Sequence, residues 1–273
     1  MDNRPIGVFD SGLGGLTAVK ELERALPGER IVYFGDTGRV PYGSRGRDTI
    51  ARYALQDTRF LLAQDVKAVL VACGTVSSVA LPQVTRAAGV PVLGAVEPAA
   101  QAAARTTRTG RVGVLGTAAT IRSGSFEAAL RALLPEAEIA ARACPLFVPL
   151  VENGYFAAEN EVARLVARDY LAEIARSGAD TVILGCTHYP LLRGVIAQAL
   201  PGAALIDAGQ ELVRAAARLL GREGLLASPG AEDEGPRERF FVSDTPEDFE
   251  RLAGIFLEHP VRGNVERVEI ERY

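Results

Sequence analysis

The sequence predicts an α/β fold of two pseudosymmetric domains, each a mostly parallel sheet with helices on both faces. Short apolar runs alternate with segments of helical periodicity, which is the pattern of parallel sheets covered by helices. The pattern restarts partway along the chain, because Val112-Gly113-Val114 repeats Ile6-Gly7-Val8 at an offset of 106 residues (112 − 6). Cys73 and Cys186 each follow an apolar run, at an offset of 113 residues (186 − 73). We therefore expect two copies of one βα unit order.

The first copy contains four expected strands. Their apolar character along the whole run is typical of strands that are buried on both faces. The helix after the first strand is stopped by Pro27-Gly28. The second helix turns Ile50, Tyr53, Ala54 and nearby apolar side chains inward. We expect strands at residues 6–9, 31–34, 68–72 and 90–93, and helices at 16–26, 47–64 and 81–88.

The second copy repeats this order. We expect strands within 110–117 and at 139–143, 181–184 and 204–207, helices at 123–134, 159–177 and 191–200, and a loop at 145–154. The helix at 159–177 has its large apolar residues at helical spacing, and these are Val162, Leu165, Val166, Tyr170 and Ile174. We expect them to share one face of that helix.

A third segment completes the chain. We expect a helix at 209–220, a mobile loop at 228–236, a strand at 239–242, a helix at 246–257 and a last strand at 265–270. This tail is expected to return to the first copy. The predicted domains are therefore residues 1–97 plus 208–273, and residues 98–207.

Composition excludes several classes of protein. The 273 residues carry a formal net charge of −4 and contain no long Lys/Arg run, which argues against nucleic acid or an anionic membrane as partner. No stretch of 18 apolar residues is present, and the first strand starts too early for a signal peptide, so we expect a cytoplasmic protein. Three cysteines are too few for a disulfide framework and should be free thiols.

Polar residues follow the expected strands at their carboxyl ends, where open parallel sheets bind ligands. These residues are Asp10-Ser11, Asp36-Thr37, Cys73-Gly74-Thr75, Thr117, Cys186-Thr187-His188 and Asp207. Two similar domains with these edges facing each other would form an active site in the interdomain cleft. Each domain would then contribute one cysteine to it.

Two opposed thiols suit inversion at a carbon atom, because one can remove a proton while the other delivers a proton to the opposite face. A free thiol has a pKa of about 8.5. We expect helix N-termini after Cys73 and Cys186 to lower the pKa of both thiols. His188 and Asp10 are candidates for moving protons to and from them. Hydroxyl groups that could hold carboxylates belong to Ser11, Thr75, Thr117 and Thr187.

At these residues the chain resembles a known family, the cofactor-independent glutamate racemases of the aspartate/glutamate racemase superfamily. The resemblance covers nearly the whole chain. It is carried by the stretches Gly7-Val8-Phe9-Asp10-Ser11-Gly12-Leu13-Gly14-Gly15-Leu16, Phe34-Gly35-Asp36-Thr37, Pro41-Tyr42-Gly43, Ala72-Cys73, Gly116-Thr117-Ala118-Ala119-Thr120 and Gly185-Cys186-Thr187-His188-Tyr189-Pro190-Leu191.

The resemblance implies interconversion of L-glutamate and D-glutamate by a two-base mechanism with no cofactor and no metal. It implies that Cys73 acts on D-glutamate and Cys186 on L-glutamate, with helper roles for Asp10, Glu152 and His188. It also implies that D-glutamate supplies peptidoglycan synthesis and that the chain forms a homodimer. The substrate-binding positions that it implies are Asp10, Ser11, Tyr42, Gly43, Gly74, Thr75, Thr117, Thr120, Thr187 and His188.

One residue departs from the family pattern. The family has Asn between the first cysteine and its threonine, and this chain has Gly74. An amide that contacts the substrate is therefore missing. This departure keeps open a racemase for aspartate or another amino acid.

Other functions are weighed against this one. A non-catalytic amino-acid-binding module would have the same cleft. A dinucleotide enzyme is disfavoured, because the third glycine of its motif would fall at Thr17 and Asp10 would repel the pyrophosphate. A metal site of Cys73, Cys186 and His188 would quench both thiols. Outside the motifs, Cys144 and His259 are interpreted as structural.

Overall fold

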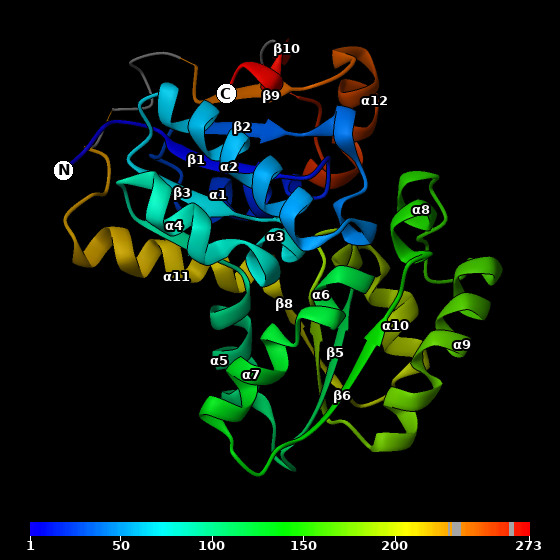
Figure 1. Cartoon of the computed structure of the whole chain (residues 1–273). Coiled ribbons are helices and arrows are strands. Elements are labelled where there is room, and N and C mark those ends of the chain that lie inside the picture. The colour runs from blue at the N-terminus through cyan, green and yellow to red at the C-terminus, as the bar shows by residue number, and fades with distance from the viewer. Residues whose placement is uncertain (229, 231–235, 262–264) are drawn as a thin grey trace.

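Two parallel sheets organise the computed structural model, which describes residues 1–228, 230, 236–261 and 265–273 (Figure 1). The upper sheet in Figure 1 has the strand order β10-β9-β2-β1-β3-β4 and the lower sheet the order β6-β5-β7-β8, and every pairing within them is parallel. The upper strands are β1 (Ile6–Asp10), β2 (Ile31–Gly35), β3 (Ala68–Val71), β4 (Val92–Gly94), β9 (Glu238–Val242) and β10 (Val265–Arg267). The lower strands are β5 (Arg111–Gly116), β6 (Glu138–Ala143), β7 (Thr181–Leu184) and β8 (Ala204–Asp207).

The same strand order appears in both sheets. The order β2-β1-β3-β4 matches β6-β5-β7-β8 strand for strand, so Cys73 and Cys186 follow equivalent strands, β3 and β7. The predicted fold class is confirmed. The predicted domain boundaries fall at the second residue of α5 and the last residue of β8. They stay predictions, because sheet membership alone does not define a boundary.

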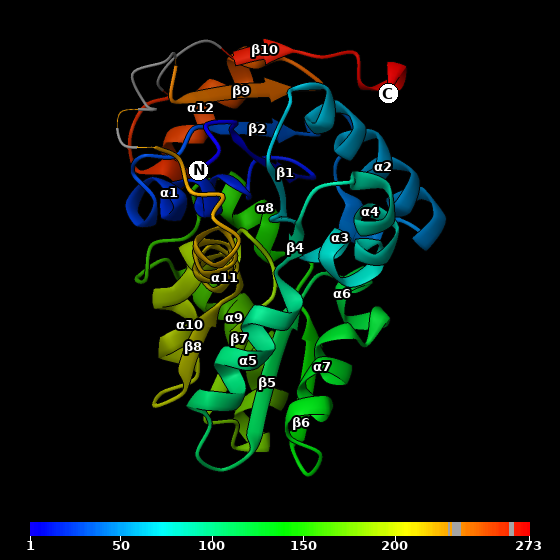
Figure 2. The same ribbon diagram turned by 90° about the vertical axis from the view of Figure 1, so that its left-hand side faces the viewer.

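Helices cover both sheets (Figures 1 and 2). In the first half these are α1 (Leu16–Ala25), α2 (Arg47–Ala63), α3 (Gly74–Val79), α4 (Leu81–Ala88) and α5 (Val96–Thr106). In the second half they are α6 (Ala118–Ser123), α7 (Ser125–Leu133), α8 (Phe147–Glu152), α9 (Glu161–Ser177) and α10 (Arg193–Ala199). The last two helices are α11 (Ala208–Arg222) and α12 (Pro246–Leu257). The described chain also contains the short 3₁₀ helices η1 (Thr37–Arg39), η2 (Tyr42–Ser44), η3 (Tyr189–Leu192) and η5 (Ile270–Arg272).

Helix α11 connects the two halves. It contacts α1 of the first half and β8 and α5 below it, and Figure 2 shows it end-on between α1 and β8. Its start is fixed by Asp207, whose side chain accepts a hydrogen bond from the backbone N–H of Gln210 at 3.0 Å. The strand that ends at Asp207 and the helix that begins after it thus hold the lower sheet against the upper one.

Several sequence predictions were wrong in detail. The loop expected at 145–154 contains α8, because Phe147 and Val151 lie one turn apart and are buried together. The helix expected at 123–134 is α7, and a further helix that was not predicted, α6, precedes it and ends at Gly124, whose φ is +66°. Helices α3 and α5 were not predicted at all. The last strand ends at Arg267, before the turn η5.

The buried face of α9 was also misread. Val162 and Leu165 are 47% and 51% exposed, and the buried residues are the smaller Ala163 and Ala167 with Leu171 and Ile174. Of the five large residues expected on one face, Ile174 is buried and Val166 and Tyr170 pack partly buried against the core, so only Val162 and Leu165 were wrongly placed. The loop expected at 228–236 lies largely outside the described residues. In the described part of the chain, no helix is both long and apolar enough to cross a membrane.

Candidate active site

A cavity of about 370 Å³ lies where the carboxyl ends of the two sheets meet. Both halves contribute to its walls, including the two strand-end cysteines. It is lined by Ser11, Gly12, Val40, Pro41, Tyr42, Gly43, Ser44, Cys73, Gly74, Thr75, Thr117, Ala118, Cys144, Pro145, Val148, Pro149, Glu152, Cys186, Thr187, His188 and Tyr189. Of the predicted site residues, only Asp10 and Thr120 do not line it. The roles of all these residues stay predictions.

The first half-site consists of Cys73 and the residues that contact it. Cys73 ends the loop after β3 and is the N-cap residue of α3. Its side chain is buried, and the thiol donates to the hydroxyl of Ser11 at 3.5 Å. The hydrogen-bond partner of the Cys73 thiol is therefore a neutral hydroxyl group.

The second half-site carries a histidine and a carboxylate. Cys186 follows β7 and is 8% exposed. Two residues later, His188 Nε2 lies 2.9 Å from Glu152 Oε1 of α8. The other ring nitrogen, Nδ1, is buried and has no hydrogen-bond partner among the described residues. The His188–Glu152 pair is a route by which a proton could reach the cavity.

Both thiols are harder to ionise than a free cysteine. Burial, followed by the charge of Asp10, raises the pKa of Cys73 to about 11. Burial also raises the pKa of Cys186, against a backbone N–H of His188 that lowers it. The expectation of lowered pKa values was wrong, because desolvation outweighs the hydrogen bonds that favour the thiolates. Helix α3 is short, and Cys186 is followed by the turn η3 rather than directly by a helix.

Asp10 lies behind the cavity wall, between the two half-sites. Its carboxylate accepts hydrogen bonds from the backbone N–H of Gly12 at 3.0 Å and from the hydroxyl of Thr187 at 3.3 Å. Burial raises its pKa, while the imidazole of His188 lowers it. Its charge acts on both thiols, raising the pKa of each. Asp10 is thus placed to influence both cysteines without lining the cavity.

Three threonine hydroxyls form a row of hydrogen bonds that joins the two halves. The hydroxyl of Thr75 is 2.9 Å from that of Thr117, which is 3.0 Å from that of Thr120. Thr75 belongs to α3, and the other two belong to the start of α6. Thr117 also caps α6 by accepting from the backbone N–H of Thr120 at 3.2 Å. Thr120 therefore orients Thr117 from behind.

The departure at Gly74 has a steric explanation. A Cβ atom on Gly74 would lie 2.1 Å from the carbonyl oxygen of Gly185, which is backbone of the opposite half. A Cβ on Gly14 would lie 2.1 Å from Thr187 Oγ1 and 2.5 Å from His188 Nδ1. Both glycines thus allow the first half to approach the loop that carries Cys186. An Asn at position 74 would force the two backbones apart.

Tyr42 and Gly43 form a further wall. A Cβ on Gly43 would lie 2.7 Å from that of Thr117, so this loop also meets the second half closely. The Tyr42 hydroxyl points away to two buried carboxylates, Asp36 and Asp57. The sequence reading did not assign Asp57. The sequence feature that could have identified Asp57 is its charge, because it lies among the inward-facing apolar residues of the helix at 47–64.

Residues before and within α8 were missed as well. Pro145, Val148 and Pro149 line the cavity. Cys144, interpreted as structural, lines it too, and burial raises the pKa of its thiol to about 12. Nothing in the local sequence distinguishes these residues from an ordinary loop.

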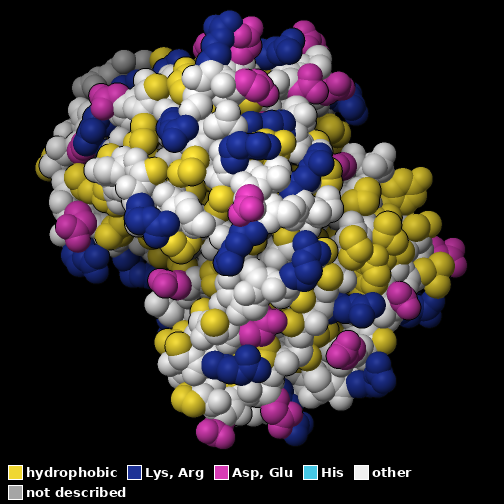
Figure 3. All heavy atoms as spheres, in the orientation of Figure 1, with side chains coloured by type: hydrophobic (Ala, Val, Ile, Leu, Met, Phe, Trp, Pro, Cys, Tyr) yellow, Lys and Arg dark blue, Asp and Glu magenta, His cyan; other side chains and the backbone are white. Residues whose placement is uncertain are grey.

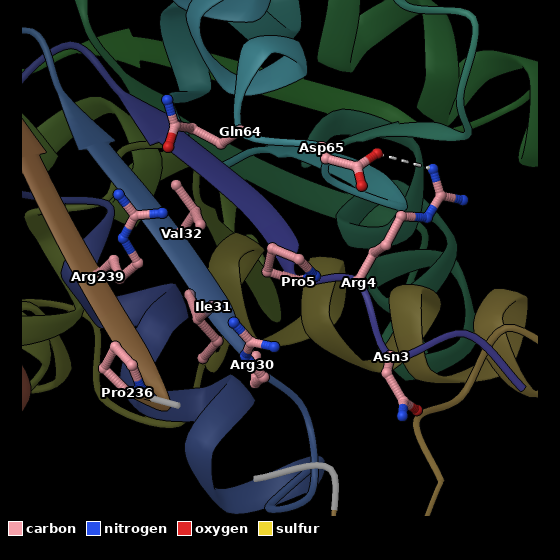
Figure 4. A pocket seen from close by; sticks show the side chains of 10 residues that line it. All are labelled: Asn3, Arg4, Pro5, Arg30, Ile31, Val32, Gln64, Asp65, Pro236 and Arg239. Atoms are coloured by element: carbon pink, nitrogen blue, oxygen red, sulfur yellow. Dashed lines mark hydrogen bonds and ion pairs between the residues drawn. The ribbon is translucent and has the colours of Figure 1, made fainter. Parts of the chain in front are cut away.

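Another cavity, of about 390 Å³, lies at the amino ends of β1, β2 and β9 (Figure 4). Arg4, Arg30 and Arg239 line it, but the Arg4 guanidinium contacts Asp2 and Asp65, and Arg239 lies 3.9 Å from Glu266. Its charges are therefore largely balanced, and it contains neither cysteine. Among the described residues, no group of three His, Cys, Asp or Glu side chains is placed to hold a metal ion.

Comparisons with known proteins agree with this geometry. The family model for Asp/Glu/Hydantoin racemase matches residues 6–216. The glutamate racemase of Geobacter metallireducens is 46% identical over 98% of this chain and 97% of its own. The glutamate racemase of Francisella tularensis, solved with D-glutamate, superposes with a TM-score of 0.92 at 37% identity and covers 100% of both chains. That of Thermus thermophilus, solved with beta-chloro-D-alanine, gives 0.87 at 46% identity, again covering 100% of both. The chain therefore belongs to the Asp/Glu/Hydantoin racemase family, within its glutamate racemase branch.

Proposed function

We propose that this chain interconverts L-glutamate and D-glutamate with two cysteine thiols and no cofactor. The observation that carries the proposal is that Cys73 and Cys186 line one cavity from opposite halves. The relatives named as glutamate racemases, one of them solved with D-glutamate, support glutamate as the substrate.

The reaction is a proton transfer at the α-carbon. In one direction, the Cys73 thiolate takes the α-proton of D-glutamate, so that the C–H bond breaks and an S–H bond forms. The Cys186 thiol gives its proton to the opposite face of the carbon, which produces L-glutamate and leaves the Cys186 thiolate. In the other direction the two thiols exchange roles. A later proton exchange between the two sites returns the enzyme to its starting state.

Ionisation of a buried thiol requires help from the substrate. A glutamate ammonium group in a water-poor cavity adds a positive charge near the thiols and favours thiolate. The proton that leaves the first thiol can pass to Asp10 or to the His188–Glu152 pair. The resting enzyme would then keep both thiols neutral and would form the base only in the complex.

The cavity walls offer groups that suit two carboxylates. Hydroxyls come from Ser11, Thr75, Thr117 and Thr187, and backbone N–H groups come from Gly43 and Gly74. Donors that point at a developing negative charge also stabilise the carbanion-like transition state. This arrangement fits an α-amino acid with a second carboxylate.

The test is racemisation in D₂O with no added cofactor. We expect one deuterium at the α-carbon of the product and no dependence on pyridoxal phosphate. Aspartate is assayed alongside, because faster turnover of aspartate would replace glutamate as the substrate. Binding of glutamate with no exchange of the α-proton would favour the amino-acid-binding module instead.

We propose further that the enzyme is a cytoplasmic homodimer. D-glutamate would supply peptidoglycan synthesis in the cytoplasm, where reducing conditions keep thiols free. A homodimer is supported by exposed large apolar residues next to α8 and on α9, which are Leu146, Tyr155, Val162 and Leu165. Figure 3 shows an apolar surface at the right, where α8 and α9 lie in Figure 1. Leu165→Asp should shift the mass measured by light scattering from dimer to monomer. An unchanged mass would remove this surface from the interface.

A further inference from the structure

Behind the Tyr42 wall, two buried carboxylates share one arginine. Asp36 follows β2 and Asp57 lies on α2, and neither side chain is exposed. Arg39 Nε donates to Asp36 Oδ2 at 2.7 Å, and its Nη2 donates to Asp57 Oδ1 at 3.0 Å. The Tyr42 hydroxyl contacts Asp36 Oδ2 and lies 3.1 Å from Asp57 Oδ2.

The charges of this cluster do not balance if both carboxyl groups are ionised. The remaining contacts are neutral: Ser243 Oγ donates to Asp36 at 2.7 Å, Gln56 accepts from Arg39 at 2.6 Å, and the Tyr53 ring lies 4.1 Å from the guanidinium. Asp10, from the neighbouring β1, adds further negative charge rather than positive. Within the described residues, neither carboxylate has an ion pair to a second cation. A buried uncompensated charge is costly, so one proton must be bound here.

The hydrogen bonds indicate which carboxyl group holds it. Asp36 accepts from Arg39, from the Tyr42 hydroxyl and from Ser243, which is the environment of an ionised carboxylate. The single proton of the Tyr42 hydroxyl is then used. Within the described part of the chain, Asp57 Oδ2 contacts only the Tyr42 oxygen, and it needs its own proton to bond to it.

We infer that Asp57 is held as a neutral carboxylic acid, which donates to the Tyr42 oxygen while the Tyr42 hydroxyl donates to the Asp36 carboxylate. Arg39 then neutralises Asp36 and donates to the carbonyl oxygen of Asp57. Burial, followed by the charge of Asp36, raises the pKa of Asp57 well above its ordinary value, which agrees with a protonated Asp57. Burial also raises the pKa of Tyr42, so the phenol keeps its proton.

This chain of hydrogen bonds fixes one wall of the cavity. Tyr42 and Gly43 line it, and Gly43 contacts Thr117 of the second half. Asp36, Arg39 and Asp57 do not line the cavity, so we assign them as positioning residues. Their effect on turnover rests on the proposed function, whereas the protonation of Asp57 does not.

Two isosteric substitutions distinguish the carboxyl groups. Asp57→Asn keeps both bonds of a neutral acid, because the amide N–H donates to Tyr42 and the amide oxygen accepts from Arg39. We expect its kcat and KM to stay within about threefold of the wild type, since the wall geometry is kept. Asp36→Asn removes the carboxylate that accepts from Arg39, Tyr42 and Ser243. Asp57 must then lose its proton to pair with Arg39 and can no longer donate to Tyr42, so we expect kcat/KM to fall by about 100-fold, mostly through KM. Asp57→Leu, which can form neither bond, is the control and should resemble Asp36→Asn.

Equal losses in Asp57→Asn and Asp57→Leu would overturn the inference, and so would tolerance of Asp36→Asn alone. A spectroscopic measurement does not depend on activity or on stable variants at position 36. Infrared spectra of the wild type with ¹³C-labelled aspartate should contain a band of a protonated carboxyl group at neutral pH, which disappears in Asp57→Asn. Absence of that band, or its persistence in Asp57→Asn, would overturn the inference even if glutamate were the substrate. If the band is present but glutamate is not turned over, only the proposed function fails.

Discussion

The two half-sites share their backbone plan and differ in their proton-handling groups. Cys73 and Cys186 follow equivalent strands of sheets with the same strand order. Cys73 has a hydroxyl neighbour, Ser11, whereas Cys186 lies beside His188 and its partner Glu152. Duplication of the fold therefore explains why two thiols face one cavity. It does not make their chemical surroundings equal.

Such an asymmetry is compatible with racemisation. Mirror-image amino acids have the same free energy, so the equilibrium constant is one and kcat/KM must be equal in both directions. Unequal half-sites can therefore show themselves only in individual kcat and KM values and in solvent exchange. Experiments that separate exchange from inversion test the comparison most directly.

The largest expected effect is the loss of either thiol. Cys73→Ser and Cys186→Ser should each lower kcat for racemisation by about 10²- to 10⁴-fold, the range for a general acid or base. Each variant should retain α-proton exchange with D₂O from one enantiomer only: L-glutamate for Cys73→Ser and D-glutamate for Cys186→Ser. NMR of the α-proton measures exchange, and polarimetry measures inversion.

Cys144→Ser is the matched control, because its thiol lines the same cavity but has no assigned role. It should stay close to wild-type activity. Full racemisation by either Cys73→Ser or Cys186→Ser would rule out the two-thiol mechanism.

The next effect concerns the contact between the half-sites at Gly74. Gly74→Ala places a Cβ against the Gly185 carbonyl oxygen, so the two backbones must separate. Because a displacement of about 1 Å can cost about 100-fold in rate, we expect a loss of that order in kcat. Steady-state kinetics with glutamate and aspartate measure it.

Gly89→Ala is a control for folding, since a Cβ there meets no atom of the described residues within 4 Å, although its φ of 66° adds local strain. Wild-type kcat in Gly74→Ala would show that the halves move apart freely. Gly74→Asn tests the departure from the family pattern, and recovered activity in it would show that the amide compensates for the separation.

Repeated sequence motifs could be predicted from the sequence, whereas contacts between distant elements could not. The cysteines were identified because duplicated motifs repeat along the chain, and the parallel sheets follow from their apolar strands. Asp57 was not assigned, because its partners Asp36 and Arg39 come from other elements and only folding brings them together. The pKa direction of both thiols was wrong, because burial depends on packing between the halves. On α9, Val162 and Leu165 were wrongly placed in the core, because the small side chains of Ala163 and Ala167 are buried at the start of that helix instead.

A smaller effect is expected from the proton-handling pair of the second half-site. Glu152→Gln keeps a side chain that can contact His188 but removes its negative charge. We expect kcat to fall by about tenfold, because the carboxylate supports proton transfer through the imidazole rather than acting on the substrate. Exchange from L-glutamate, which uses Cys186, should fall more than exchange from D-glutamate. Equal reductions would place the pair in a role shared by both thiols, and Glu159→Gln is a control outside the cavity lining.

The smallest expected effect is on the pH dependence of the free energy of unfolding, which reports whether Cys73 is ionised in the free enzyme. The pKa of Cys73 is raised to about 11, so the folded protein keeps a proton that the unfolded chain releases near pH 9. Its contribution to the free energy of unfolding is therefore complete below pH 9 and is lost as the pH rises towards 11. Linkage gives a loss of about 1 kcal/mol between pH 8 and pH 10. Cys73→Ser has no such proton, so urea titrations at both pH values should show a smaller decline for this variant, while the other titrating groups cancel. If the thiolate already existed in the free enzyme at neutral pH, the wild type would lose no more stability than Cys73→Ser, and activation of the thiol would not require the substrate.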